Sequence, residues 1–218
     1  MSRTLILFQN FLSREAKAAI SIPPSSHEVI TGMVLSDAHI SKHSTTGISR
    51  LIFRQKDREF IQFLWDIFNE IGIVGAAPRT YNYFDKHTGN TYTIHSFDTY
   101  ALSQLGVLRS EWYTLEDGKS VKHLPFDIGV RLTPVAIAFW LAGEGHYVKD
   151  QGVDRISTDS FSIDEVQYLQ AILLERYNIS STLSSAGAGK EQYRIRIAKA
   201  SMPTLQSLVG RGPLICHQ

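Results

Sequence analysis

The 218-residue sequence has little cysteine, no long apolar run and almost no net charge. Its single cysteine, Cys216, excludes an internal disulfide framework and a cysteine-rich zinc site, and it favours an intracellular protein. No apolar run approaches the roughly 20 residues of a membrane-spanning helix, so no membrane partner is expected. The formal net charge of +1 is low for a nucleic-acid-binding protein. Any basic surface must therefore come from local clustering of arginine and lysine.

Two short apolar stretches, which look helical, each end in an acid followed by a small residue. Residues 30–38 contain Asp37, and residues 137–145 contain Glu144. An acid at a helix C-terminus faces the negative end of the helix dipole, which costs about 0.3–1 kcal/mol and which a cation would offset. Two such helices side by side would bring two carboxylates to one divalent metal ion. For either helix alone, the alternative is an ordinary core helix with a solvated acid.

Capping signals precede both stretches and predict where the helices begin. Ser25 and Glu28 form an S-x-x-E capping box before the first. Thr133 and Pro134 supply an N-cap and a proline at the first helical position before the second.

The same order of elements follows each acid. A polar, strand-like stretch leads to an amphipathic helix, predicted over residues 58–71 in the first half and 162–177 in the second. Two further strand-like segments follow each helix, including residues 92–97 and 193–197, and a last helical stretch closes each half. The chain is therefore predicted to contain two copies of helix, two strands, helix, two strands, helix.

With these motifs and this repeated order, the sequence resembles the LAGLIDADG homing endonucleases in their single-chain form, which carries two motif copies. The resemblance covers roughly residues 25–218 and includes the phrases Leu-Thr-Pro at 132–134 and Ser-Met-Pro-Thr-Leu at 201–205. It implies an α+β fold of pseudo-symmetric tandem αββαββα repeats. Two antiparallel, saddle-shaped sheets and a central two-helix interface are expected.

Four segments follow from this reading. An N-terminal arm is expected at residues 1–24, a first LAGLIDADG half at 25–116, a linker at 117–131 and a second LAGLIDADG half at 132–218. The arm is apolar and then basic, and we expect it to pack on the first half. A poor transit peptide is the alternative.

The resemblance implies metal-dependent hydrolysis of DNA. Asp37 and Glu144 are expected to bind Mg²⁺ where the two motif helices meet, with one acid serving each strand. Backbone carbonyls around Ser36 and Gly143 would complete the metal site. Gln55 matches a polar family position beside the metals and is expected to order the attacking water.

Lys122, in a Lys-x-Leu-Pro phrase, matches a basic family position that stabilises the phosphate. Its alternative is a solvated linker lysine. The second half departs from the family pattern, because Thr158 stands in place of the glutamine and no lysine-containing tail follows. Unequal cleavage of the two strands, or impaired activity, is therefore left open.

Alternation along the predicted strands gives each sheet one apolar and one polar face. Reading of bases in the major groove needs donors, acceptors and bidentate arginines, which such a polar face supplies. The alternative is an antiparallel sheet with one solvated face. The candidate DNA-binding residues are Ser41, His43, Arg50, Arg54, Arg79, Tyr81, Tyr83, Thr93 and His95 in the first half and Lys149, Arg155, Ser157, Arg194 and Arg196 in the second.

Two further features of the motifs carry expectations. The second motif has Phe139 where the first has Gly32, which predicts a large residue against a small one across the helix interface. His39 and His146 follow the acids closely without a metal-ligand spacing, so they are interpreted as phosphate or base contacts.

The expected partner is double-stranded DNA, bound by a monomer that already contains both halves and cleaved at a specific site on both strands. An RNA-binding maturase that assists splicing of intron RNA, or a DNA-binding protein without cleavage, is the alternative within the fold. A small metal-dependent enzyme of another kind is the alternative outside it. Retention of both carboxylates favours the nuclease. An intron-encoded protein of this family would be made in an organelle, either a mitochondrion or a chloroplast.

Overall fold

The computed structural model describes residues 12–42, 47–86, 88–148, 151–185 and 192–210. The chain forms two compact units. One contains residues 1–23 and 38–107, and the other contains residues 24–37 and 108–218. The first acidic motif therefore belongs to the same unit as the second. Within the described ranges, no helix has the length and apolar character needed to cross a membrane.

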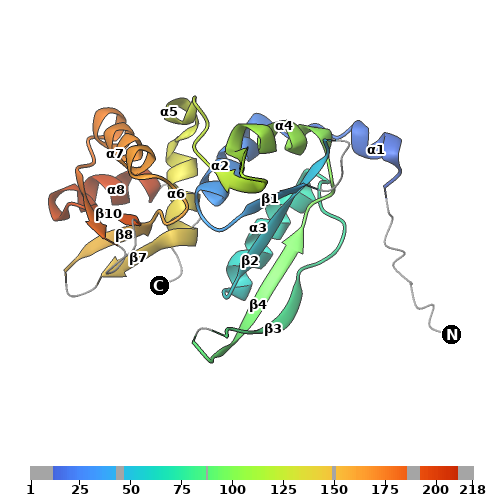
Figure 1. The fold of residues 1–218 in the computed structure, drawn as a ribbon, viewed down its shortest axis with the longest axis horizontal. Helices are drawn as coiled ribbons and strands as arrows, with labels where there is room; N and C mark the ends of the chain where they lie inside the picture. The colour runs from blue at the N-terminus through green and yellow to red at the C-terminus, as the bar shows by residue number, and fades with distance from the viewer. Residues whose placement is uncertain (1–11, 43–46, 87, 149–150, 186–191, 211–218) are drawn as a thin grey trace. The chain divides into compact units, whose positions relative to one another are not determined.

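The first unit is a four-stranded antiparallel sheet with a helix on one face (Figure 1). Its elements are α1 (Arg14–Ala18), β1 (His39–Lys42), β2 (Ser49–Gln55), α3 (Arg58–Glu70), β3 (Arg79–Phe84) and β4 (Thr91–Asp98). The strands lie in the order β1-β2-β4-β3, so the two central strands are β2 and β4. Helix α4 (Ser103–Trp112) then leads from the first unit into the second.

Helix α3 confirms the amphipathic helix predicted over residues 58–71, although it ends one residue earlier. Asp57 caps it by accepting a hydrogen bond of 2.9 Å from the backbone N–H of Phe60. Its apolar stripe is buried against the sheet, where the ring of Phe68 lies 5.1 Å from that of Phe53. Phe53 stacks in turn on Phe97 at 4.7 Å. These aromatic rings form the centre of the first core.

The second unit repeats this plan and contains the helices of both motifs. Its elements are α2 (Pro24–Leu35), β5 (Tyr113–Glu116), β6 (Lys119–Lys122), α5 (Ile128–Arg131), α6 (Pro134–Glu144), β7 (Gly145–Val148), β8 (Val153–Ser157), α7 (Ile163–Tyr177), β9 (Ser181–Ser185), β10 (Tyr193–Ile197), the 3₁₀ turn η1 (Lys199–Ser201) and α8 (Met202–Val209). The sheet order is β7-β8-β10-β9, and α7 packs on β9 and β10. Strands β5 and β6 form a separate hairpin.

The predicted repeat of helix, two strands, helix, two strands, helix is confirmed twice along the chain. The segment predicted as a linker, residues 117–131, contains strand β6 and helix α5. Of the predicted arm, residues 1–11 lie outside the described residues, and the rest contains α1.

The capping predictions have different outcomes at the two motif helices. Thr133 caps α6 as predicted, accepting a 3.2 Å hydrogen bond from the N–H of Ala136. The prediction of a capping box at Ser25 and Glu28 is wrong, because α2 already begins at Pro24 and includes both residues. Proline is favoured at the first helical position because it has no N–H to leave unpaired there, which explains the earlier start.

Helices α2 and α6 approach each other closely at a glycine. A Cβ atom added to Gly32 would lie 2.3 Å from the carbonyl oxygen of Ala136 and 2.7 Å from Cβ of Phe139. Phe139 is itself buried. The predicted large residue against a small one is therefore confirmed, and only glycine fits this contact without a shift of backbone.

We expect Gly32→Ala to destabilise the protein by about 1–3 kcal/mol, because the added methyl group overpacks the backbone of α6. This loss of stability should appear even though alanine is more favourable than glycine in a helix interior by roughly 1 kcal/mol. Urea unfolding of both proteins measures the difference. Gly129→Ala is the control, since its Cβ would meet the end of the Tyr168 side chain at 3.3 Å rather than backbone. An equal effect of the two substitutions would contradict the argument.

Candidate active site

The two predicted acids come together where α2 and α6 end. Asp37 stands two residues after the last residue of α2, and Glu144 is the last residue of α6. Glu144 is half-buried and hydrogen-bonds to Asp37, whereas Asp37 is exposed. The close contact at Gly32 explains this convergence, since it aligns the C-terminal ends of the two helices in one compact unit.

Glu144 has strongly perturbed acidity. Its pKa is raised to about 8, first by burial and then by the hydrogen bond to Asp37 and the negative charge of Asp37. The charge of Asp159 adds to the rise, and a hydrogen bond with Ser157 opposes it. Two carboxylates held this close repel each other when both are ionised, so a cation between them would be favourable.

Lys122 also lies at this site, at the end of β6. Its Nζ donates a hydrogen bond of 3.2 Å to the backbone oxygen of Ser36. Burial lowers the pKa of Lys122 to about 8, although the negative charges of Asp37 and Glu144 act in the opposite direction. Lys122 is therefore a half-buried neighbour of both acids and not a solvated linker lysine.

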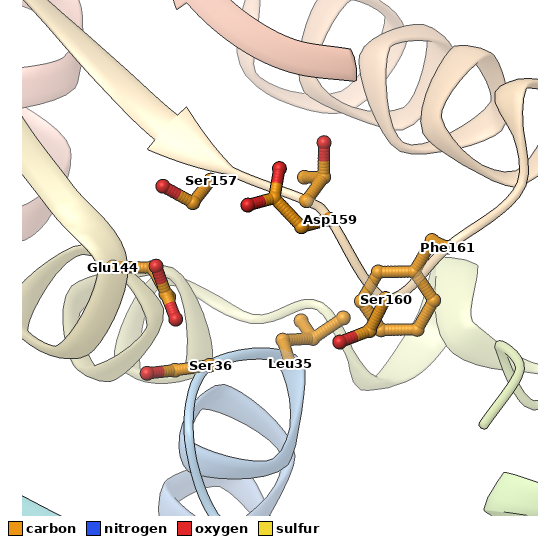
Figure 2. A pocket seen from close by; sticks show the side chains of 8 residues that line it. Leu35, Ser36, Glu144, Ser157, Asp159, Ser160 and Phe161 are labelled. Carbon is orange, nitrogen blue, oxygen red and sulfur yellow. The ribbon is translucent and has the colours of Figure 1, made fainter. Parts of the chain in front are cut away.

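A small pocket opens beside Glu144 (Figure 2). Its volume is about 90 Å³, enough for a few water molecules. It is lined by Leu35, Ser36, Glu144, Ser157, Thr158, Asp159, Ser160 and Phe161. Figure 2 shows the carboxylate of Asp159 on the same side of the pocket as Glu144 and Ser157. The hydroxyl of Ser36 is buried and has no hydrogen-bond partner among the described residues.

The atoms gathered here suit a hard divalent cation. Mg²⁺ prefers oxygen ligands, keeps several waters and takes one or two carboxylates together with phosphate oxygens. Asp37, Glu144 and the unpaired Ser36 hydroxyl are such oxygens. In the described part of the chain, no group of three or more His, Cys, Asp or Glu side chains is arranged to hold a metal ion. A cation would therefore need oxygens from backbone, water or substrate as well.

The two predicted carbonyl ligands are placed differently. The carbonyl of Ser36 already accepts the hydrogen bond from Lys122. Gly143 lies in the last turn of α6, where carbonyl groups lack an intrahelical partner. Both remain candidates, and Ser36 could serve a cation only alongside or in place of the lysine.

Sequence reasoning missed Asp159 as part of this pocket and assigned Ser157 to DNA contacts alone. Asp159 directly follows Thr158, the position matched to the family glutamine, and this adjacency was the available signal. Thr158 is buried and donates its hydroxyl hydrogen bond to the backbone oxygen of Tyr193. Gln55, the glutamine of the first half, ends β2 in the first unit, and its role remains a prediction.

The sheet of the first unit has a polar face that carries six of the predicted DNA contacts. Directly paired residues and residues two apart on a strand share a face. The register pairs Ser41 with Arg50, and it places Arg54 and Arg79 on either side of Ser96. The residues on this face are Ser41, Arg50, Arg54, Arg79, Tyr81 and Tyr83.

The prediction that Thr93 and His95 share this polar face is wrong. Both lie on β4 at an even spacing from Phe97, which packs in the core under α3. His95 is only 9% exposed, and its Nδ1 lies 2.8 Å from the hydroxyl oxygen of Thr80. Alternation within the strand fixes which residues share a face, but the sequence alone did not show which of the two faces α3 covers.

The sheet of the second unit has a corresponding basic face. Arg155 lies directly opposite Arg196, and Ser157 directly opposite Arg194, while Ile195 and Ile197 point to the buried side. The predicted grouping of these arginines on one face is therefore confirmed. The two remaining candidates, His43 and Lys149, lie outside the described residues.

The fold and the site together define a two-motif α+β protein in which two helices bring one acid each to an oxygen-lined pocket. The chain belongs to the LAGLIDADG DNA endonuclease family, whose model matches residues 27–205.

Curated relatives include both maturases and endonucleases. Cytochrome b mRNA maturase bI2 of Debaryomyces hansenii is 30% identical over 180 residues, which is 82% of this chain and 66% of that protein. DNA endonuclease I-ChuI of Chlamydomonas applanata is 24% identical over 198 residues, covering 87% of this chain and 91% of that protein. The chain spans less than two thirds of the length of its maturase relatives, and only 43% of the length of cytochrome b mRNA maturase bI2 from Saccharomyces cerevisiae.

Solved structures share the fold. The homing endonuclease I-WcaI, bound to its DNA recognition sequence, has a TM-score of 0.69 at 22% identity, covering 85% of this chain and 80% of that chain. I-DmoI in complex with DNA and Mn has a TM-score of 0.51 at 12% identity, covering 88% and 97%.

We expect the pKa of Glu144 to appear in the pH dependence of stability. Because its folded pKa of about 8 exceeds the ordinary value of 4.5, the unfolded state loses this proton first as pH rises. Protonated Glu144 therefore favours the folded state: the stability it contributes is fully present below pH 4.5 and is lost as the pH rises towards 8. Urea unfolding in EDTA between these pH values should show a falling free energy of unfolding that is flatter in Glu144→Gln.

Glu175→Gln is the matched control, because Glu175 is an exposed acid on α7 of the same unit. It should leave the profile of the unmodified protein unchanged. The same slope in all three proteins would show that Glu144 titrates normally.

Proposed function

We propose that this protein is a site-specific DNA endonuclease that makes a double-strand break in a long DNA target by metal-dependent phosphodiester hydrolysis. One observation carries the proposal: the acids of two motif helices, Asp37 and Glu144, meet beside Lys122 at an oxygen-lined pocket. Membership in a DNA endonuclease family supports the same conclusion.

In this proposal each side chain has a defined task. Asp37 and Glu144 hold divalent cations, with one acid serving each DNA strand. A bound Mg²⁺ supplies Lewis-acid stabilisation of the phosphate and lowers the pKa of a bound water. Lys122 places its ammonium group near the phosphate, where it offsets developing negative charge. Ser36 and Ser157 orient water in the pocket, and Gln55 keeps its proposed role in ordering the nucleophile.

Substrate binding is assigned to the polar faces of the two sheets. Arginines are grouped on each face, which supplies local positive charge in a chain of net charge +1. Phosphate contacts from such residues give affinity, and bidentate contacts to guanine give specificity. A chain with both motifs needs no second copy, so a monomer is proposed.

A second function is favoured by one specific observation. The relative that is 30% identical is named as a cytochrome b mRNA maturase. An RNA-binding role in the splicing of intron RNA is therefore the alternative, with or without DNA cleavage. It would use the same fold without requiring both acids.

The metal and the location are also proposals. Mg²⁺ is favoured by the oxygen-only donor set, and solved structures of the same fold were obtained with Mn and with Mg. An organelle, and a mitochondrion first, is supported by relatives named for cytochrome b mRNA and for an intron-encoded endonuclease.

Cleavage of a duplex DNA library in Mg²⁺ tests the main function. We expect the unmodified protein to cut a defined sequence and Asp37→Asn and Glu144→Gln each to lose at least about 100-fold in rate, because each removes a charged metal ligand. Gel-shift affinity for the selected duplex should change little. Undiminished cutting in both variants would refute the assigned site, and absence of cutting with tight intron RNA binding would favour the maturase.

Lys122→Met should lower the single-turnover cleavage rate by about 10²–10³-fold, the usual loss when one preorganised charge is removed from a transition state. Its affinity for DNA should be nearly unchanged, since the lysine is half-buried. The control is Lys119→Met, which removes an exposed lysine from the same strand β6. Equal losses in the two variants would point to non-specific electrostatics.

A further inference from the structure

An acid lies among the arginines on the polar face of the first sheet. Asp98 is the last residue of β4, the strand between β2 and β3. Its Oδ2 lies 3.3 Å from Nη1 of Arg50 on β2, and its Oδ1 lies 3.6 Å from Nη2 of Arg79 on β3. One carboxylate therefore stands between arginines from both neighbouring strands.

The acid lies beneath the arginines. The side chain of Asp98 is 17% exposed, against 39% for Arg50 and 62% for Arg79. The guanidinium groups therefore reach further into solvent than the carboxylate does. A base or phosphate approaching this face would meet Arg50 and Arg79 before Asp98, which disfavours direct reading of DNA by the acid.

An acid on a DNA-binding surface needs an explanation, because it repels phosphate. A stabilising role does not explain it, since partly exposed ion pairs contribute little to the free energy of unfolding. A role in orienting the arginines explains it better. Arg50, Arg54 and Arg79 share this face, and Asp98 offsets the repulsion among their charges. The ion pairs also restrict the arginine side chains before DNA binds, so less conformational entropy is lost on binding.

The two arginines still have N–H donors for a ligand while they are paired with Asp98. A guanidinium group has five N–H donors, and Arg79 uses its Nε for a 3.1 Å hydrogen bond to Ser96 in addition to the ion pair. The Nε of Arg50 is buried and has no hydrogen-bond partner among the described residues, so Arg50 can offer a ligand only its Nη groups. Bidentate contact with guanine demands a fixed guanidinium orientation, which two-point fixation of this kind provides.

We propose that Asp98 is a positioning residue that sets the sequence specificity of the DNA contacts made by Arg50 and Arg79. The inference rests on the proposed function, because it concerns recognition of the DNA target. Asp98 does not itself touch the bases, and its effect passes through the two arginines.

Selection from a randomised duplex DNA library in EDTA, which prevents metal-dependent cleavage, tests the inference on the full chain. The unmodified protein should yield a sequence motif. Asp98→Asn should lose about tenfold in discrimination at a few base pairs of that motif, while its affinity for random duplex stays equal or rises. Asp66→Asn is the matched control, because it removes the same charge from an exposed position on α3 and should leave the motif unchanged.

A double-variant comparison separates positioning from direct contact. In a background of Arg50→Gln and Arg79→Gln, Asp98→Asn should have no further effect on discrimination, and Asp98→Glu alone should restore part of it. If Asp98→Asn fails to fold, Ser96→Ala tests the same idea. This substitution removes the hydrogen bond from Arg79 Nε to Ser96 and should weaken discrimination at the same base pairs.

Two results would overturn the inference while leaving the proposed function intact. One is an unchanged motif in Asp98→Asn, and the other is an effect of Asp98→Asn that persists in the arginine double variant. Failure of the unmodified protein to select any motif would instead refute the proposed function, and the role of Asp98 with it.

Discussion

The close contact between α2 and α6 is the constraint on which the site depends. Because Gly32 has no side chain, the backbone of α2 comes against Ala136 and Phe139 of α6, and the helices end together. This places Asp37 beside Glu144 and opens the pocket next to them. Packing thus brings two like charges together, and a cation bound between them would offset their repulsion.

Charge is arranged differently at the pocket and on the two sheets. At the pocket, burial disfavours the charged forms of both Glu144 and Lys122. It raises the pKa of Glu144 and lowers that of Lys122, and neighbouring negative charges raise both pKa values. On the first sheet Asp98 stands between two arginines, whereas on the second sheet Arg155 and Arg196 face each other directly. The two halves share a fold and differ in how their arginines are held.

The repeated elements could be predicted because each carries a local signal. The period of the apolar residues predicted the helices and strands, and the helix predicted over residues 162–177 is present as α7 with Ser162 as its N-cap. The start of α2 was predicted wrongly because two local signals competed, and the proline prevailed over the serine. The face occupied by His95 could not be predicted, since a polar residue in a strand is compatible with either side until a helix covers one of them.

The sequence by itself determined the family, the αββαββα repeat and the identity of the two acids, because motif spacing and hydrophobic period are local properties of the chain. Only the tertiary structure decided that Lys122 reaches Ser36, that Asp159 joins the pocket and that Asp98 lies between Arg50 and Arg79. These groupings join residues far apart in sequence, and they depend on strand register and helix contact, which no local pattern encodes.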